Sequence, residues 1–312
     1  MASLLDKRLI FVTGKGGVGK TTVAIALGLA AARRGRRVIV CEVARQERVS
    51  RALGRDGAGY QETEIAPSLW AMSIDPERAL EEYLRDQVGS RALMALVFEN
   101  RIFQYLATAT PGLREMVTIG KIWELAQLER RSPTATPYDL VIVDAPATGH
   151  GLGLLRTPRT FRDVARVGPV RRQADIIHSF VSDPRRTGVV GVALPEEMPV
   201  NETLDLERRL SDDLGMALDA VVVNAVYPER FSAAEATRIA AAAATEPSAA
   251  ARDALGAASA EQHRARTQRA QLRRLRREAP EGLPVGTLPY LFDVAAGPEA
   301  RERLARELDR LL

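Results

Sequence analysis

The run Thr13-Gly14-Lys15-Gly16-Gly17-Val18-Gly19-Lys20-Thr21-Thr22 decides the fold class of this 312-residue chain. It follows an apolar stretch at residues 9–12 and precedes an Ala- and Leu-rich segment at residues 23–34 with helical spacing. A glycine-rich turn between a strand and a helix is the context in which a phosphate-binding loop forms. Glycines let successive backbone N–H groups turn inward around phosphate oxygens, and the helix N-terminus adds partial positive charge. The sequence therefore predicts a strand, a phosphate-binding loop and a helix over residues 9–34.

Two side chains of this run have the chemistry to complete a nucleotide site. Lys20 is expected to reach the β- and γ-phosphates of ATP, and the Thr21 hydroxyl is expected to bind Mg²⁺. The alternative is a glycine-rich turn that holds no ligand. We predict that ATP and Mg²⁺ bind here, and the residues expected to hold the nucleotide are Gly14, Gly16, Gly17, Val18, Gly19, Lys20, Thr21 and Thr22.

The rest of the chain alternates short apolar runs with helical stretches, which is typical of a parallel sheet with crossover helices. We expect an α/β fold, a P-loop NTPase with seven or eight mostly parallel strands, helices on both faces and a helical subdomain. The predicted strands lie near residues 8–13, 37–42, 69–74, 139–144, 188–194, 219–224 and 284–288. We expect one domain over residues 1–312, with helical insertions at about 76–132, 158–186 and 229–282.

Composition sets broad limits on the class of protein. Hydrophobic residues make up 46% of the chain and charged residues 27%, as in soluble globular proteins. No apolar run is long enough to span a bilayer and no secretory signal is recognisable, so we expect a cytoplasmic protein that is not integral to a membrane. The single cysteine, Cys41, excludes a disulfide framework, and the net charge of +4 is weak evidence for nucleic-acid binding.

A second lysine, Lys15, directly follows the first glycine of the loop. The loop thereby resembles the deviant Walker A motif of a group of dimeric nucleotide hydrolases. That group includes the partitioning ATPases, nitrogenase iron protein, and the arsenite-pump and tail-anchored-protein-targeting ATPases. The resemblance implies that Lys15 reaches across a dimer to the partner's nucleotide and takes part in catalysis. The alternative is an ordinary surface lysine.

Asp144 ends the predicted strand 139–144. A carboxylate beside the P-loop strand can orient the water shell of Mg²⁺, which makes Asp144 a predicted catalytic and metal-site residue. The alternative is an aspartate that caps the next helix. The run Asp144-Ala145-Pro146-Ala147-Thr148-Gly149-His150 resembles switch II of the arsenite-pump and tail-anchored-targeting ATPases, in which Gly149 would offer its amide to the γ-phosphate.

Further matches to this family extend along nearly the whole chain. Asn224 closes the run 221–224 and resembles the asparagine that reads adenine, although a strand-end turn residue is the alternative. Pro289 lies in the run 288–292, which resembles the loop that flanks the nucleotide. The resemblance implies one half of a two-half arsenite ATPase or one subunit of a targeting dimer.

The chain departs from the family pattern in switch I. Aligned without a gap, Ala44 takes the place of the aspartate that positions the attacking water, which should slow hydrolysis by about 10²–10⁴-fold. Glu42 and Glu47 are candidate substitutes. The chain also lacks a Cys-x-x-Cys pair and a cysteine triplet, so we expect neither zinc nor arsenite.

These observations predict an ATPase that closes as a dimer around nucleotide, holds a protein client and hydrolyses ATP weakly. Its partner would be a second copy or a paralogue. The alternatives are a partitioning-type ATPase acting on DNA or a membrane, and a non-catalytic ATP-binding scaffold. We do not expect nucleic-acid binding, because no aromatic or recognition motif accompanies the arginines Arg264, Arg266, Arg269, Arg273, Arg274, Arg276 and Arg277.

Overall fold

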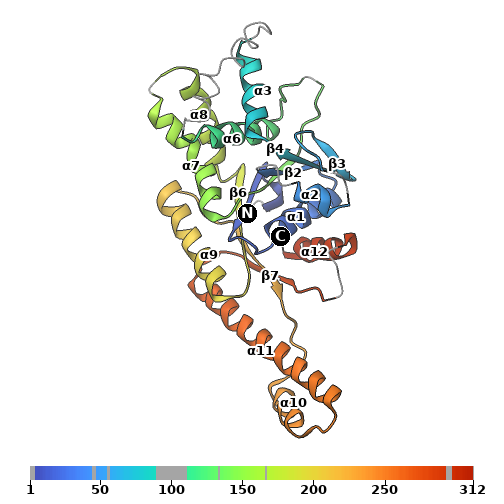
Figure 1. The fold of residues 1–312 in the computed structure, drawn as a ribbon. Coiled ribbons are helices and arrows are strands. Elements are labelled where there is room, and N and C mark those ends of the chain that lie inside the picture. The colour runs from blue at the N-terminus through green and yellow to red at the C-terminus, as the bar shows by residue number, and fades with distance from the viewer. Residues whose placement is uncertain are drawn as a thin grey trace.

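The computed structural model describes residues 4–43, 47–54, 57–88, 111–132, 134–165, 167–292 and 297–311. Eight strands form one sheet in the order β3-β4-β2-β5-β1-β6-β7-β8 (Figure 1). Their bounds are β1 (Leu9–Gly14), β2 (Val38–Val43), β3 (Thr63–Ala66), β4 (Leu69–Ile74), β5 (Leu140–Asp144), β6 (Thr187–Ala193), β7 (Ala220–Val226) and β8 (Val285–Pro289). All neighbours are parallel except β3 and β4, which confirms the predicted α/β fold with a mostly parallel sheet.

The central strand β1 shows why the sheet needs helices on both faces. All six of its residues are buried, and the first four alternate between two apolar clusters. Leu9 and Phe11 pack on one side, whereas Ile10 and Val12 pack on the other. A strand buried on both faces reads as a continuous apolar run, which is the pattern that revealed it in the sequence.

Each face of the sheet has its own set of helices (Figure 1). The cluster that holds Ile10 and Val12 includes residues of α1 (Lys20–Arg33) and α12 (Pro298–Leu311). The opposite cluster includes residues of α6 (Leu113–Leu125), α7 (Thr148–Val164), α8 (Pro169–Val181) and α9 (Glu197–Arg209). Short elements complete this part of the fold: η1 (Leu4–Asp6), α2 (Arg48–Ala52) and the π-helical turn η2 (Leu210–Leu214).

The three segments predicted to be helical insertions have distinct structures. In the first, α3 (Pro76–Val88) and α6 are described, and residues 89–110 lie outside the described part. The second segment does not begin a helix at Pro158, because α7 starts at Thr148 and continues through that proline to Val164. In the third, α10 (Ala233–Thr245) and α11 (Ala249–Glu278) form a hairpin that extends away from the sheet (Figure 1).

The far end of this hairpin has little packing against the rest of the chain. Every residue of α10 is described, and none is buried. The buried residues of the 30-residue α11 all lie in its C-terminal half, at Ala265, Gln268, Leu272 and Leu275. Among the described helices, including this longest one, none is long and apolar enough to cross a membrane.

Gly14 is a point at which the fold tolerates no side chain. Its φ is +148°, and a Cβ built there would lie 2.2 Å from the carbonyl oxygen of Val192, its partner in β6. We therefore expect Gly14→Ala to lower the free energy of unfolding by about 2–4 kcal/mol, through overpacking and backbone strain. Chemical denaturation measures this loss. Gly16→Ala is the matched control, because a Cβ at Gly16 meets nothing within 4 Å, and equal midpoints for the two variants would contradict the expectation.

Candidate functional site

A cleft of about 370 Å³ opens where β1, β2 and β5 end at the carboxyl edge of the sheet. One wall is the glycine loop between β1 and α1, in which Gly17 and Gly19 have φ values of +83° and +94°. The opposite walls come from the ends of β2 and β5 and from the start of α2. The lining residues are Gly16, Gly17, Gly19, Lys20, Thr21, Glu42, Val43, Arg48, Asp144, Ala145, Pro146 and Ala147.

The Lys20 side chain lies over the loop that precedes it. Its Nζ donates hydrogen bonds to the carbonyl oxygens of Gly14 at 3.1 Å and Lys15 at 2.9 Å. Burial lowers the pKa of Lys20, an effect that the nearby Asp144 carboxylate opposes. The loop thus holds its ammonium group at the place where a phosphate-binding loop presents a cation.

Thr21 and Asp144 form the polar contact at the floor of the cleft. The Thr21 hydroxyl donates to Asp144 Oδ2 at 2.5 Å, and Asp144 is only 8% exposed. Burial raises the pKa of Asp144, while the Thr21 hydrogen bond and the charges of Lys20 and Arg48 act in the opposite direction. A hydroxyl and a carboxylate are the hard oxygen donors that suit Mg²⁺, which usually takes few protein ligands and completes its shell with water and phosphate oxygens. The donor set therefore fits Mg²⁺, and within the described ranges no cluster of three or more His, Cys, Asp or Glu offers another metal site.

A second cavity, of about 250 Å³, adjoins the first at Thr21. It is lined by Thr22, Asn224, Pro289 and neighbours from α1, α12 and the ends of β7 and β8. The Asn224 side-chain amide donates to the Val18 carbonyl oxygen at 3.0 Å, so the end of β7 is tied to the glycine loop. The fold thus gathers the residues predicted for the base next to those predicted for the phosphates.

Lys15 and Gly149 lie outside both cavity linings. The Lys15 ammonium pairs with the Glu202 carboxylate of α9 at 2.7 Å, and both side chains are about one-third exposed. Gly149 is exposed in the first turn of α7, beyond the Ala145–Ala147 segment that lines the cleft. Both positions remain accessible to a group that approaches from outside the protomer.

The two glutamates considered as substitutes at switch I have other contacts. Glu42 is 3% exposed, and its two carboxylate oxygens accept the backbone N–H groups of Arg48 at 2.7 Å and Val49 at 3.0 Å. The Glu47 carboxylate accepts a hydrogen bond from Arg51 at 3.2 Å. Glu42 therefore anchors α2 to the end of β2, and Ala44 itself lies outside the described residues.

Arg48 is a cleft residue that the sequence reasoning missed. It begins α2 and lines the phosphate side of the cleft. The signal that could have revealed it is its positive charge, four residues after Ala44 in the segment that resembles switch I.

A glycine loop between the first strand and the first helix, with Thr21 against Asp144 at the carboxyl edge of a parallel sheet, defines a P-loop NTPase fold. The model of the family described as "Anion-transporting ATPase" matches residues 7–173 and 162–246, and the chain belongs to this family. The hairpin helix α11 lies beyond the matched residues.

The similar relatives carry names from several branches of the family. The chain is 32% identical to "ATPase BagA" of Mycobacterium tuberculosis H37Rv over 231 residues, which cover 71% of this chain and 66% of that one. It is 28% identical to a "Putative arsenical pump-driving ATPase" of Halobacterium salinarum over 237 residues, covering 72% of this chain and 36% of that one. It is 26% identical to an "ATPase ASNA1 homolog" of Entamoeba dispar over 258 residues, covering 70% and 76%.

The raised pKa of Asp144 leads to a prediction about stability and pH. Because the folded-state pKa lies above the ordinary value, the charged carboxylate destabilises the nucleotide-free protein at neutral pH, and this cost disappears as pH falls through the folded-state pKa. Asp144→Asn keeps a hydrogen-bond acceptor for Thr21 and removes the charge. We expect this variant to unfold at a higher denaturant concentration than the wild type at about pH 8, with a smaller difference at about pH 4, near the ordinary pKa of an aspartate.

Denaturation without nucleotide at both pH values measures this effect. Asp253→Asn, an exposed change on α11, serves as control and should leave the stability unchanged at both. A wild type that is more stable than Asp144→Asn at the higher pH would contradict the expectation.

Proposed function

We propose that this chain is an ATPase of the arsenite-pump and tail-anchored-targeting type. It closes as a dimer around Mg²⁺–ATP and holds a protein client. The observation that carries the proposal is the course of α7. This single helix starts beside the phosphate cleft, directly after Pro146 and Ala147, and reaches an apolar pocket at Phe161. A rigid helix that touches both places can convey the presence of a γ-phosphate to a client site.

The nucleotide part of the proposal rests on the two adjoining cavities. Lys20 and the loop amides would hold the β- and γ-phosphates, and Thr21 and Asp144 would hold Mg²⁺, which supplies charge neutralisation at the phosphates when bound. Thr22, Asn224 and Pro289 would surround the base. Arsenite and zinc are not part of the proposal, because the chain has a single cysteine.

The client part rests on the pocket at the other end of α7. Side chains of α3, α6, α7 and α8 line it, with Met116, Val117, Phe161, Val170 and Ile177 among them. The apolar residues of the 158–186 segment divide between two environments, since Phe180 and Val181 pack in the core whereas Val170 and Ile176 are 46% and 44% exposed. Exposed apolar side chains beside an apolar pocket are typical of a protein-binding surface.

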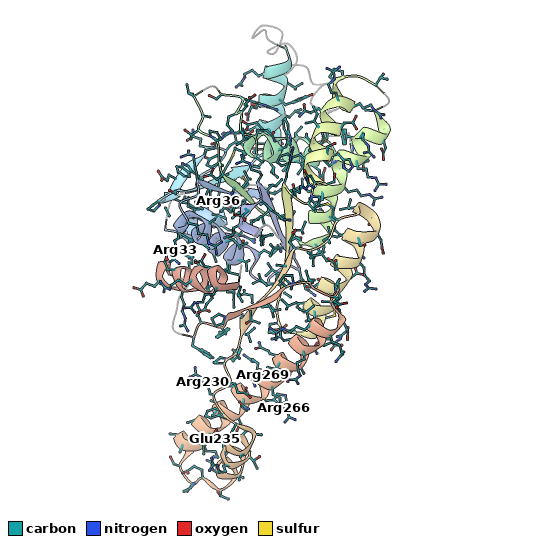
Figure 2. All side chains as sticks on the ribbon, turned by 180° about the vertical axis from the view of Figure 1, so that it is seen from behind. Arg33, Arg36, Arg230, Glu235, Arg266 and Arg269 are labelled. Atoms are coloured by element: carbon teal, nitrogen blue, oxygen red, sulfur yellow. The ribbon has the colours of Figure 1, made fainter. Side chains whose placement is uncertain are left out.

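The alternative of a partitioning-type ATPase that binds DNA is less well supported. Arg230, Arg266 and Arg269 lie near the root of the hairpin (Figure 2), and several arginines of this region already have partners. Arg230 pairs with Glu261, Arg269 with Glu229, and Arg274 with Glu278 and Asn201. Arginines committed to neighbouring carboxylates offer less charge to a phosphate backbone. A non-catalytic scaffold remains the second alternative, since Glu42 is committed to α2, and single-turnover hydrolysis separates it from a working ATPase.

Lys15 should govern association rather than nucleotide binding within one protomer. We expect sedimentation velocity to show the wild type associating when Mg²⁺–ATP is added. Lys15→Ala should bind ATP within about twofold of the wild type but associate weakly, because the ion pair that it loses in the monomer is exposed. Lys20→Ala is the control and should lose about tenfold or more in ATP affinity, and association with it. Equal association of Lys15→Ala and the wild type would contradict the cross-dimer role.

The position of Ala44 yields a kinetic prediction. Ala44→Asp restores a carboxylate that can orient water, so kcat should rise by about tenfold or more while ATP affinity changes little. Ala44→Asn has nearly the same shape without the charge and should not accelerate turnover. Steady-state phosphate release measures both variants. A wild type that already turns over at about 10 s⁻¹, an ordinary enzymatic rate, would show the weak-hydrolysis interpretation to be wrong.

A further inference from the structure

We propose that Arg48 contacts the γ-phosphate of bound ATP and thereby distinguishes ATP from ADP in this chain. This inference rests on the proposed function, because it requires a nucleotide in the cleft. It goes beyond that function by assigning the discrimination between ATP and ADP to one named residue of this chain, Arg48.

The placement of Arg48 is the first observation. It lines the same cleft as Lys20, Thr21 and Asp144, and its side chain is exposed. Its guanidinium forms no hydrogen bond or ion pair with any residue that the structure describes, whereas Arg51 on the same helix pairs with Glu47. Arg48 is thus a cation at the phosphate cleft whose donors are available to a ligand.

The backbone of Arg48 is fixed, although its side chain pairs with none of the residues in the described ranges. Glu42 Oε1 accepts the Arg48 N–H at 2.7 Å, and Glu42 Oε2 accepts the Val49 N–H at 3.0 Å. Val49 is fully buried in the cluster that also contains the residues of α1. Glu42 is therefore a positioning residue, which holds the start of α2 so that the Arg48 side chain begins at a defined point on the cleft wall.

The register of the sheet determines which part of the cleft Arg48 faces. Glu42 in β2 pairs with Asp144 in β5, so the anchor of Arg48 lies beside the carboxylate proposed for Mg²⁺. Burial has the largest effect on the pKa of Lys20, Glu42 and Asp144, raising it for the two carboxyl groups, and the positive charge of Arg48 is close enough to act on all three in the downward direction. The side chains proposed to surround Mg²⁺ and the terminal phosphate are therefore within electrostatic range of Arg48. Arg48 does not line the second cavity, proposed for the base, which α2 reaches through Ala52.

The chemistry of the guanidinium suits this position. Arginine presents a planar set of donors that matches phosphate oxygens and stays charged at any physiological pH. ATP carries about one more negative charge than ADP, and the γ-phosphate that brings it is the group proposed to lie at this position, so a cation placed there favours ATP over ADP. Position 44 carries alanine rather than a carboxylate, and position 48 carries arginine. These two positions therefore provide a cation for the phosphate and no acidic group. They would hold ATP without activating water.

The test compares the affinities of the full chain for Mg²⁺–ATP and Mg²⁺–ADP by calorimetry. Arg48→Gln keeps the length and polarity of the side chain and removes the charge. We expect ATP affinity to fall about tenfold and ADP affinity to stay within about twofold, because only ATP loses a charge-assisted contact. Arg51→Gln is the matched control on the same helix and should leave both affinities unchanged. Arg48→Lys should retain part of the ATP affinity, since it keeps the charge but loses the fork.

The outcomes separate this inference from the function on which it rests. If the wild type binds both nucleotides and Arg48→Gln lowers neither affinity, or lowers both equally, the γ-phosphate role is overturned while the nucleotide site stands. If the wild type binds neither nucleotide, the proposed function falls and the inference falls with it. A thermal melt of each variant identifies any loss of affinity that comes from unfolding.

Discussion

The contact between the glycine loop and the strands beneath it is the constraint on which the site depends. Gly14 meets the Val192 carbonyl oxygen of β6, and Gly19 meets the Asn224 amide of β7, each so closely that a Cβ would lie 2.2 Å from the neighbour. This contact fixes the loop against three consecutive strands of the sheet, β1, β6 and β7. Because α1 begins at Lys20 directly after the loop, the positions of the Lys20 ammonium and the Thr21 hydroxyl follow from it.

The same edge of the sheet concentrates buried charge. Glu42 and Asp144 are register partners in β2 and β5, both are buried, and burial raises the pKa of each. Desolvated carboxylates side by side oppose folding unless donors and cations surround them. The backbone amides of α2, the Thr21 hydroxyl and the charges of Lys20 and Arg48 provide this surrounding. Such an arrangement is common at functional sites, where stability is lost in order to place charge for a ligand.

Two helical elements extend from the nucleotide region in different directions. On one side, α7 leads from the phosphate cleft to the apolar pocket. On the other side, the root of α11 lies at the base cavity, where Gln268 accepts the Tyr227 N–H at 2.7 Å and donates to the Ala225 carbonyl at 3.3 Å. Tyr227 also stacks on Tyr290, which lines that cavity, with ring centroids 4.6 Å apart. The first helix therefore begins next to the lining of the phosphate cleft, and the second contacts Ala225, which lines the cavity proposed for the base.

Asn224 and Pro289 were singled out by the resemblance of short runs to the family pattern. The sequence by itself determined the loop, the central strands and the place of Asp144 at the end of one of them. These features are local, since a glycine pattern or a continuous Val/Ile/Leu run specifies its own conformation, and parallel strands must end at one edge. The sequence did not reveal β3, because a four-residue edge strand that pairs antiparallel with β4 has too few residues to show a pattern. The sequence also predicted a helical segment that starts at Pro158, but this proline lies within α7. The helix continues through it because packing of Leu154 and Leu155 in the core outweighs the one hydrogen bond that proline removes. The pairing of Lys15 with Glu202, the anchoring of α2 by Glu42 and the placement of Arg48 in the cleft were decided only by the tertiary structure. They depend on which strands and helices become neighbours, and that is a property of the whole sheet rather than of any short stretch of residues.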